Sequence, residues 1–126
     1  MNPISQKLVR GTVGELLVQL RLLQFDVQAA PPIKDSGNDL IAVRGSRFCA
    51  IQVKTTAGKT YSVAKLPEFY HILAVVQLAG EGSVLYLDAS RIFFIPKDRV
   101  RDAPRRIDKI GYFELCQEQI DFLFPT

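Results

Sequence analysis

Two apolar runs separated by a glycine and a serine constrain this chain most. Residues 39–44 and 47–55 are rich in aliphatic side chains, and Gly45-Ser46 stands between them. Glycine at the first of two central positions suits the tight turn of a β-hairpin. Both runs are apolar at odd and even positions alike, which is typical of strands covered on both faces. The sequence therefore predicts a buried hairpin at the centre of the fold.

Helical and strand patterns flank this hairpin on both sides. Apolar residues recur at helical spacing through residues 5–24, and Ser5 is a suitable N-cap. A second helix is expected over 116–124. Further strands are expected over 25–29, 72–78, 84–87, 92–95 and 112–115. This order predicts an α/β fold in which helices flank a mixed β-sheet.

The composition bounds the class of protein. The chain has 126 residues, 48% of them hydrophobic, which predicts one domain over residues 1–126 with a true core. No apolar run approaches the roughly 18 residues of a membrane helix, and the first residues lack the pattern of a signal peptide. Cys49 and Cys116 lie in apolar stretches and are expected to be buried free thiols. We therefore expect a cytoplasmic protein with no membrane partner.

Charge and motif content narrow the possible chemistry. The net charge is +3, which is compatible with a nucleic-acid partner without indicating one. Residues 91–109 contain seven basic and three acidic side chains, and a solvated loop or exposed helix is favoured there over a phosphate-binding patch. No phosphate-binding glycine motif occurs. The single histidine, His71, argues against a zinc site or a catalytic triad and is expected to pack at a strand start.

The register of the predicted hairpin gathers polar side chains at its open end. A turn at Gly45-Ser46 places Asp39 opposite Gln52, and directly opposed residues project to the same side of a sheet. Lys54 follows two residues later and projects to that side as well. An acid, an amide and an amine are thus predicted to meet on an otherwise apolar face.

The predicted first helix offers a second carboxylate. Glu15 lies on the flank of the apolar arc, and Gly11, one turn earlier, leaves room for a backbone or a ligand to approach. If this helix covers the polar face of the hairpin, Glu15 meets Asp39, Gln52 and Lys54. Two adjacent carboxylates repel each other, and a divalent cation relieves this repulsion better than a lysine does.

Oxygen ligands of this kind suit Mg²⁺ or Mn²⁺. Asp39, Glu15, the side-chain carbonyl of Gln52 and the main-chain carbonyl of Val53 are the candidate ligands. Lys54 would lie beside a metal-bound water, where an amine can orient that water or stabilise charge on a phosphate.

These residues form a pattern that resembles the PD-(D/E)XK nuclease superfamily. Glu15, the run Ser36-Gly37-Asn38-Asp39 and the run Gln52-Val53-Lys54 carry the resemblance, which covers about residues 8–56. The Gly-x-Asp and Gln-x-Lys forms are most similar to Mrr-type restriction endonucleases and archaeal Holliday-junction resolvases. The resemblance implies a restriction-endonuclease-like fold and metal-dependent hydrolysis of DNA phosphodiester bonds.

The same resemblance implies roles for single residues. Asp39 corresponds to the metal-binding aspartate and Lys54 to the catalytic lysine of the family. Glu15 corresponds to the helix carboxylate of resolvase-like members. Gln52 stands where Glu or Asp is usual, and Ser36 departs from the usual proline-type residue before the glycine.

Two functions remain open at this point. The first is a metal-dependent DNA endonuclease, selective for DNA structure rather than sequence, that acts as a homodimer. The second is a catalytically inactive module of the same fold that binds nucleic acid or a protein partner, and the neutral Gln52 favours it. The residues alone do not distinguish DNA from RNA as the ligand.

Overall fold

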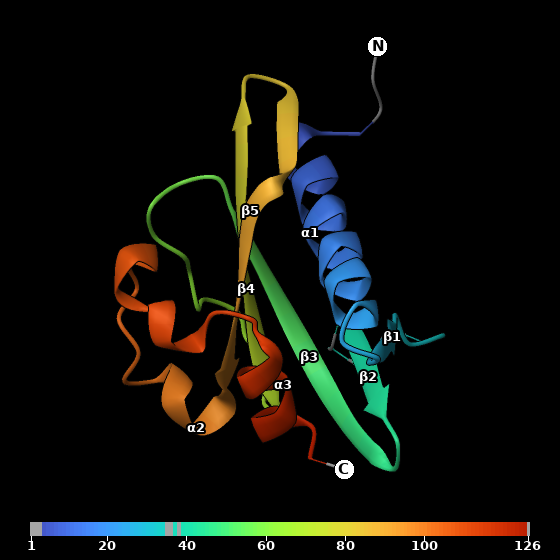
Figure 1. The fold of residues 1–126 in the computed structure, drawn as a ribbon. Coiled ribbons are helices and arrows are strands. Elements are labelled where there is room, and N and C mark those ends of the chain that lie inside the picture. Colours follow the sequence, from blue (N-terminus) through green and yellow to red (C-terminus); the bar gives the residue numbers. More distant parts are fainter. Residues whose placement is uncertain (1–3, 35–36, 38, 126) are drawn as a thin grey trace.

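A five-stranded sheet organises the molecule. The computed structural model describes residues 4–34, 37 and 39–125. Strand order in the sheet equals chain order, and β3 and β4 pair in parallel while the other neighbours are antiparallel (Figure 1). The strands are β1 (Gln28–Ala30), β2 (Leu40–Arg44), β3 (Arg47–Thr56), β4 (Ile72–Glu81) and β5 (Val84–Pro96). The sheet is mixed, as predicted.

Helices flank this sheet, and the fold is therefore mixed α/β. The long helix is α1 (Gln6–Leu23), and its first turn is closed by Ser5, whose Oγ accepts a hydrogen bond from the Leu8 N–H. The shorter elements are α2 (Lys97–Val100), the 3₁₀ turns η1 (Ile107–Lys109) and η2 (Gly111–Phe113), and α3 (Gln117–Leu123). In the part of the chain that the structure describes, no helix is long and apolar enough to cross a membrane.

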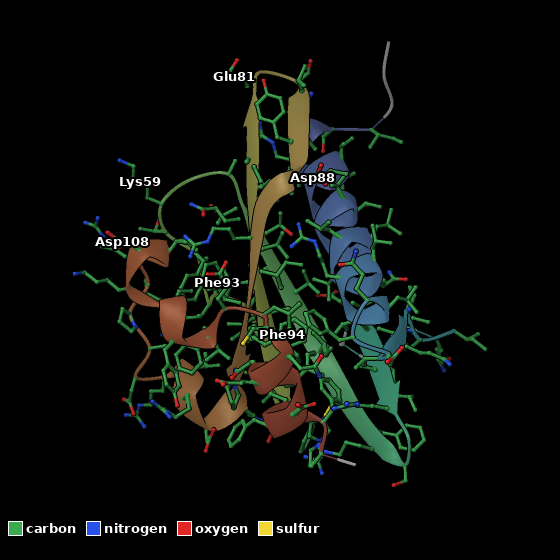
Figure 2. The ribbon with its side chains drawn as sticks, in the orientation of Figure 1. Lys59, Glu81, Asp88, Phe93, Phe94 and Asp108 are labelled. Atoms are coloured by element: carbon green, nitrogen blue, oxygen red, sulfur yellow. The ribbon has the colours of Figure 1, made fainter. Side chains whose placement is uncertain are left out.

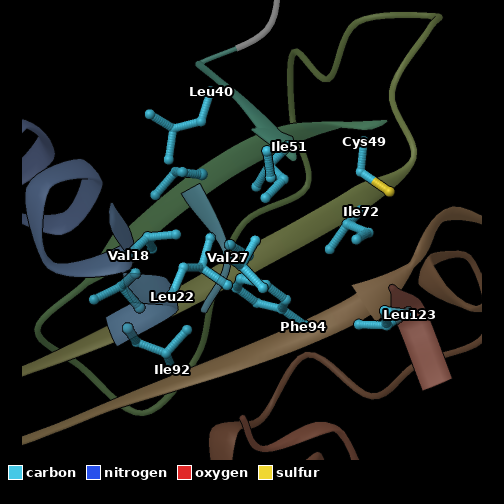
Figure 3. Packing of buried hydrophobic residues seen from close by; sticks show 14 of the residues in the cluster. Val18, Leu22, Val27, Leu40, Cys49, Ile51, Ile72, Ile92, Phe94 and Leu123 are labelled. Carbon is cyan, nitrogen blue, oxygen red and sulfur yellow. The ribbon is translucent and has the colours of Figure 1, made fainter. Parts of the chain in front are cut away.

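The face of the sheet beneath α1 forms the larger core. Leu17, Val18 and Leu22 of the helix pack with alternate strand residues such as Ile51 and Ala74 (Figure 3). Residues of α3 join the same cluster. Burial of each such aliphatic side chain contributes roughly 1.5–3 kcal/mol, so this helix-on-sheet contact fixes where α1 crosses β3.

The other face of the sheet packs against loops and short helices. Its central residues include Leu73 and Val75 of β4, and the segments over them contribute Tyr61, Tyr70, Val100, Ile107, Ile110 and Phe113. Phe93 and Phe94 of β5 point to opposite faces, and neither ring is exposed (Figure 2). The sheet is thus covered on both sides, as its apolar strands predict.

The hairpin between β2 and β3 has the predicted register. Arg44 pairs with Arg47 and Leu40 with Ile51 across a turn at Gly45, whose φ of +60° suits a residue without a Cβ. On its other side β3 pairs with β4 as far as Thr56.

Four predicted strands are wrong in extent or type. The strands expected over 84–87 and 92–95 are one strand, β5. Its ladder with β4 is irregular between Gln77 and Ala79, and there Ser90 Oγ accepts from the Ala79 N–H and donates to the Tyr86 carbonyl. The strand expected over 25–29 is only Gln28–Ala30. Residues 112–115 form no strand; their start belongs to η2, and a bridge between Glu114 and Phe93 is the remnant of pairing. Both cysteines are free, but only Cys49 is buried.

Candidate active site

The candidate site lies where β2 begins and β3 continues past it. The Asp39 N–H donates to the Ile51 carbonyl at 3.2 Å, and the Val53 N–H donates to Asp39 Oδ2 at 2.8 Å. N–H and C=O of one strand residue point to the same side, so the Val53 carbonyl lies on this edge too. Within the described residues no strand pairs with β3 here. We call residues 53–56 on this side the open edge of β3.

Helix α1 brings Glu15 to Asp39. Burial raises the pKa of the Glu15 carboxyl, and the negative charge of Asp39 and a hydrogen bond with its side chain raise that pKa further. The two carboxyl groups are therefore close enough to interact directly. The predicted meeting of the helix carboxylate with the hairpin aspartate is found in the structure.

The prediction that α1 covers the polar face of the hairpin is wrong. The helix packs on the face of Ile51 and Val53, and strand alternation puts Gln52 and Lys54 on the opposite face. The face was misassigned because the apolar residues on both sides of β3 give no periodicity that would select one. The carboxylate of Asp39 lies at the sheet edge, where a ligand can be approached from either face.

Gln52 and Lys54 have different surroundings on that opposite face. The Lys54 ammonium donates to the Ala64 carbonyl at 2.8 Å, in the segment that follows β3, and it is not paired with either carboxylate. The Gln52 Oε1 atom is buried without a hydrogen-bond partner. A buried acceptor in this condition costs about 1–3 kcal/mol, which a ligand that uses it would recover.

A cavity of about 620 Å³ joins the two faces at the open edge of β3. Its walls include Glu15 and Gly11 from α1 and Val53 and Lys54 from β3. Glu15 of α1 and Lys54 of β3 thus both contribute to the wall of this cavity, although the Lys54 side chain lies on the face of the sheet opposite α1. Asp39 and Gln52 are not among the residues that line it.

The two glycines of α1 have different roles at this cavity. A Cβ on Gly14 would lie 2.0 Å from Thr55 Oγ1, so this glycine allows the helix to approach β3. A Cβ on Gly11 would meet no atom within 4 Å. The sequence predicted that Gly11 leaves room for a backbone or a ligand. Gly11 lines the open cavity, and the close contact of the helix is made at Gly14, against the Thr55 side chain. The signal available in the sequence was the spacing of Gly14, three and four residues before Leu17 and Val18 on the apolar side of the helix.

The donor types suit a hard divalent cation, and the Gln52 side chain lies on the face of the sheet opposite Glu15. Asp39, Glu15, the Gln52 Oε1 atom and the Val53 carbonyl are all oxygen donors, the type that Mg²⁺ and Mn²⁺ prefer. The unpartnered Gln52 oxygen is the observation that fits a missing ligand. No group of three acidic, histidine or cysteine side chains gathers anywhere in the described residues. Ser36 and Asn38 of the predicted motif lie outside the described residues.

The basic segment 91–109 is used largely for internal contacts. Arg91 pairs with Glu114, Arg106 pairs with Asp108, and Arg105 donates to the carbonyls of Val100 and Ala103. His71 has a structural role as well, since its Nδ1 accepts from the Ala50 N–H. Residues 91–96 belong to β5 rather than to the expected solvated loop or exposed helix, and His71 stands directly before β4, at the predicted strand start.

Cations that the sequence did not select lie beside the candidate site. Lys7 and Arg10 line the cavity that contains Glu15 and Lys54. The sequence placed them, with Arg21, on the polar arc of the helix. Only Arg21 is used internally, through hydrogen bonds to the Leu87 and Ser90 carbonyls.

Comparison with known proteins supports the fold. No protein-family model matches the chain, and no curated protein matches it. Among solved structures the chain is similar to a bacterial homing endonuclease, I-Ssp6803I, with a TM-score of 0.57 and 15% sequence identity. The match covers 82% of this chain and 73% of that chain. The chain therefore has a nuclease-like α/β fold.

Proposed function

We propose that this protein is a metal-dependent endonuclease that hydrolyses DNA phosphodiester bonds. The observation that carries the proposal is Asp39, which ends the pairing of β2 with β3 and lies next to a second carboxyl group, Glu15. The similarity in fold to a homing endonuclease supports it. So does the resemblance of the hairpin residues to the PD-(D/E)XK pattern of Mrr-type enzymes and Holliday-junction resolvases.

Four residues have proposed ligand roles. Asp39 and Glu15 would hold Mg²⁺ or Mn²⁺ with the Gln52 side-chain oxygen and the Val53 carbonyl. When bound, the cation would polarise the phosphate and lower the pKa of a water molecule. The raised pKa of Glu15 means that cation binding competes with a proton at this carboxyl, so metal affinity rises with pH.

Lys54 has a proposed role in binding the reacting phosphate. Its ammonium is held by a single neutral acceptor, the Ala64 carbonyl, so two of its protons remain for a ligand. Lys54 lines the cavity, and its ammonium would donate to a non-bridging phosphate oxygen and stabilise the charge that develops there. Its hydrogen bond to the segment after β3 restricts where the ammonium can lie.

Cleavage assays on four DNA forms test the proposal. Wild-type protein with Mg²⁺ or Mn²⁺ is incubated with supercoiled, linear, nicked and four-way-junction DNA, and a chelator is the blank. We expect cleavage that the chelator abolishes, and a preference for the branched form would support selectivity for structure. Asp39→Asn and Lys54→Ala should each reduce the rate at least about 100-fold. Asp39→Asn keeps an acceptor for the Val53 N–H and so preserves the fold.

Matched controls separate chemistry from surface charge. Asp102→Asn and Lys109→Ala make the same changes at exposed positions remote from the cavity and should leave the rate unchanged. Sedimentation of the active protein, with and without DNA, tests whether cleavage uses the proposed homodimer.

The inactive-module alternative has its own signature. It is favoured by the neutral Gln52 and by the lack of a third acid among the described residues. Such a module would bind DNA in a salt-dependent way, and Asp39→Asn would not abolish this binding. It would cleave none of the four DNA forms, and Mg²⁺ would not raise its melting temperature. These results together would reject the enzyme in favour of the binding module.

A further inference from the structure

The cavity beside the candidate site continues along the molecule. A second cavity, of about 480 Å³, lies between α1 and the β4–β5 hairpin. Arg10 and Ala57 belong to the walls of both cavities, so the two are joined at these residues. Figure 1 shows the outer part of the β4–β5 hairpin beside the amino-terminal end of α1. We call the joined cavities the α1 groove.

The charge of the α1 groove is positive away from the candidate site. Lys7 and Arg10 are exposed, and within the described residues neither forms an ion pair. Among the described residues that line the two cavities Glu15 is the sole acid, and it lies at the candidate-site end. Glu81 and Asp88 of the hairpin, marked in Figure 2, line neither cavity. Glu81 and Asp88 are chain neighbours of lining residues, but the charged side chains in the walls away from Glu15 are the unpaired cations, which attract an anion.

The walls beyond Arg10 are built largely from small residues. Ala57, Ala79, Gly80, Gly82 and Ala89 line the second cavity together with Gln77, Leu78 and Leu85. A Cβ on Gly82 would meet no atom within 4 Å, so a ligand can approach the main chain closely there. A single inorganic anion would not extend over two joined cavities. A polyanionic chain would, because one of its charges can meet Lys54 while the next ones meet Arg10 and Lys7.

We propose that the α1 groove binds the backbone phosphates of the DNA strand next to the scissile bond. This rests on the proposed function, because Lys54 marks the end of the groove at which the reacting phosphate would lie. Lys7 and Arg10 act as positioning residues: they hold the flanking phosphates and fix which phosphate reaches Lys54. The contacts are to the backbone and favour no particular base.

Binding by a cleavage-deficient protein tests the groove. Asp39→Asn protein is titrated with a fluorescently labelled DNA duplex over a range of salt concentrations, and anisotropy gives the dissociation constant. Adding Lys7→Gln and Arg10→Gln should weaken binding about tenfold near 0.1 M salt. The slope of log affinity against log salt should fall by about 1.8, as expected for two lost phosphate contacts.

A matched pair elsewhere provides the control. Arg101→Gln and Lys109→Gln remove the same charge from exposed positions that line neither cavity, and they should change the slope far less. If the two pairs of substitutions change the affinity and the salt slope equally, or if Lys7→Gln and Arg10→Gln change neither, the proposal that the α1 groove binds DNA is wrong.

Cleavage by otherwise wild-type protein separates the two proposals. The Lys7→Gln/Arg10→Gln variant should lose kcat/KM by about the same tenfold while kcat at saturating DNA stays near wild type. If wild-type protein cleaves and this variant binds and cleaves equally well, the groove is wrong and the nuclease stands. If wild-type protein does not cleave but the variant loses DNA binding, the nuclease is wrong and the groove stands.

Discussion

The two halves of β3 differ in what holds them. Residues Arg47–Ile51 pair with β2 on one side, and Ile51 is fully buried under α1. Pairing with β4 begins only at Ile51, so residues 52–56 pair with β4 and have no strand on the other side within the described residues. We call Arg47–Ile51 the paired half and 52–56 the unpaired half, by whether β2 pairs with them. There the Asp39 carboxylate replaces a strand by accepting the Val53 N–H. The first half is held by the sheet and the core, and the second leaves backbone and side-chain oxygens for a ligand.

This difference shows how one strand can combine stability with chemistry. The paired half fixes the position of β3 to within a residue, because a shift of one would turn its core side chains to the wrong face. The unpaired half is held on one side by its ladder with β4, and its other side is left open. The candidate site is therefore held by the β2 pairing on one part of β3 and by the β4 pairing on the other.

The largest effect on stability is expected in the paired half. Ile51→Ala should lower the free energy of unfolding by about 2–5 kcal/mol, because it leaves a cavity under α1. Lys54→Ala, three residues on, removes one hydrogen bond to Ala64 and should cost under about 1.5 kcal/mol. Chemical denaturation of both variants measures the contrast. Similar losses at the two positions would contradict the division of β3 into two halves.

A smaller effect is expected where α1 crosses the unpaired half. Gly14→Ala places a Cβ against Thr55 and should destabilise the protein by about 1–3 kcal/mol despite the better helix propensity of alanine. Gly11→Ala meets open space and should stabilise by about 0.5–1 kcal/mol.

A double variant identifies the contact at Gly14. Adding Thr55→Ala to Gly14→Ala removes the atom that the new Cβ would strike, so the pair should be less destabilised than the sum of the single changes. Additive losses would mean that Gly14 serves some purpose other than the close approach to Thr55.

The sequence predicted the paired half well and the unpaired half only in part. Gly45-Ser46 fixes the turn, and the turn fixes which residues oppose each other, so the register from Arg44 to Leu40 follows from local chemistry. The face that α1 covers does not follow, because residues on both sides of β3 are apolar. Which face α1 covers is decided by the packing of the whole core, which includes residues of β4, β5 and α3.

The cations of the α1 groove were missed for a related reason. Helical spacing placed Lys7 and Arg10 away from the apolar stripe, where lysine and arginine are ordinarily solvated. Their closeness to the candidate site depends on Gly14 and on the position of the β4–β5 hairpin, which are long-range features. No pattern within α1 carries that information.

The smallest expected effect is a dependence of stability on pH that comes from Glu15. Its pKa in the folded protein is raised above the ordinary value of 4.5, so the folded state favours the protonated form. The stability contributed by Glu15 is thus fully present below about pH 4.5 and is lost as the pH rises through the raised pKa. In metal-free buffer, Glu15→Gln should have a melting temperature that increasingly exceeds that of wild type as the pH increases.

The neighbour of Glu15 provides the control for this titration. The Asp39 charge contributes to the raised pKa, but burial is the larger cause. When Asp39→Asn is present in both proteins, the effect of Glu15→Gln should therefore depend less on pH without becoming independent of it. Melting curves between about pH 4 and about pH 8 measure both effects. The difference in melting temperature between Glu15→Gln and wild type could instead stay constant over this range or shrink as the pH rises. Either result would mean that Glu15 is not partly buried beside Asp39. The proposed cation site at the open edge of β3 requires that position.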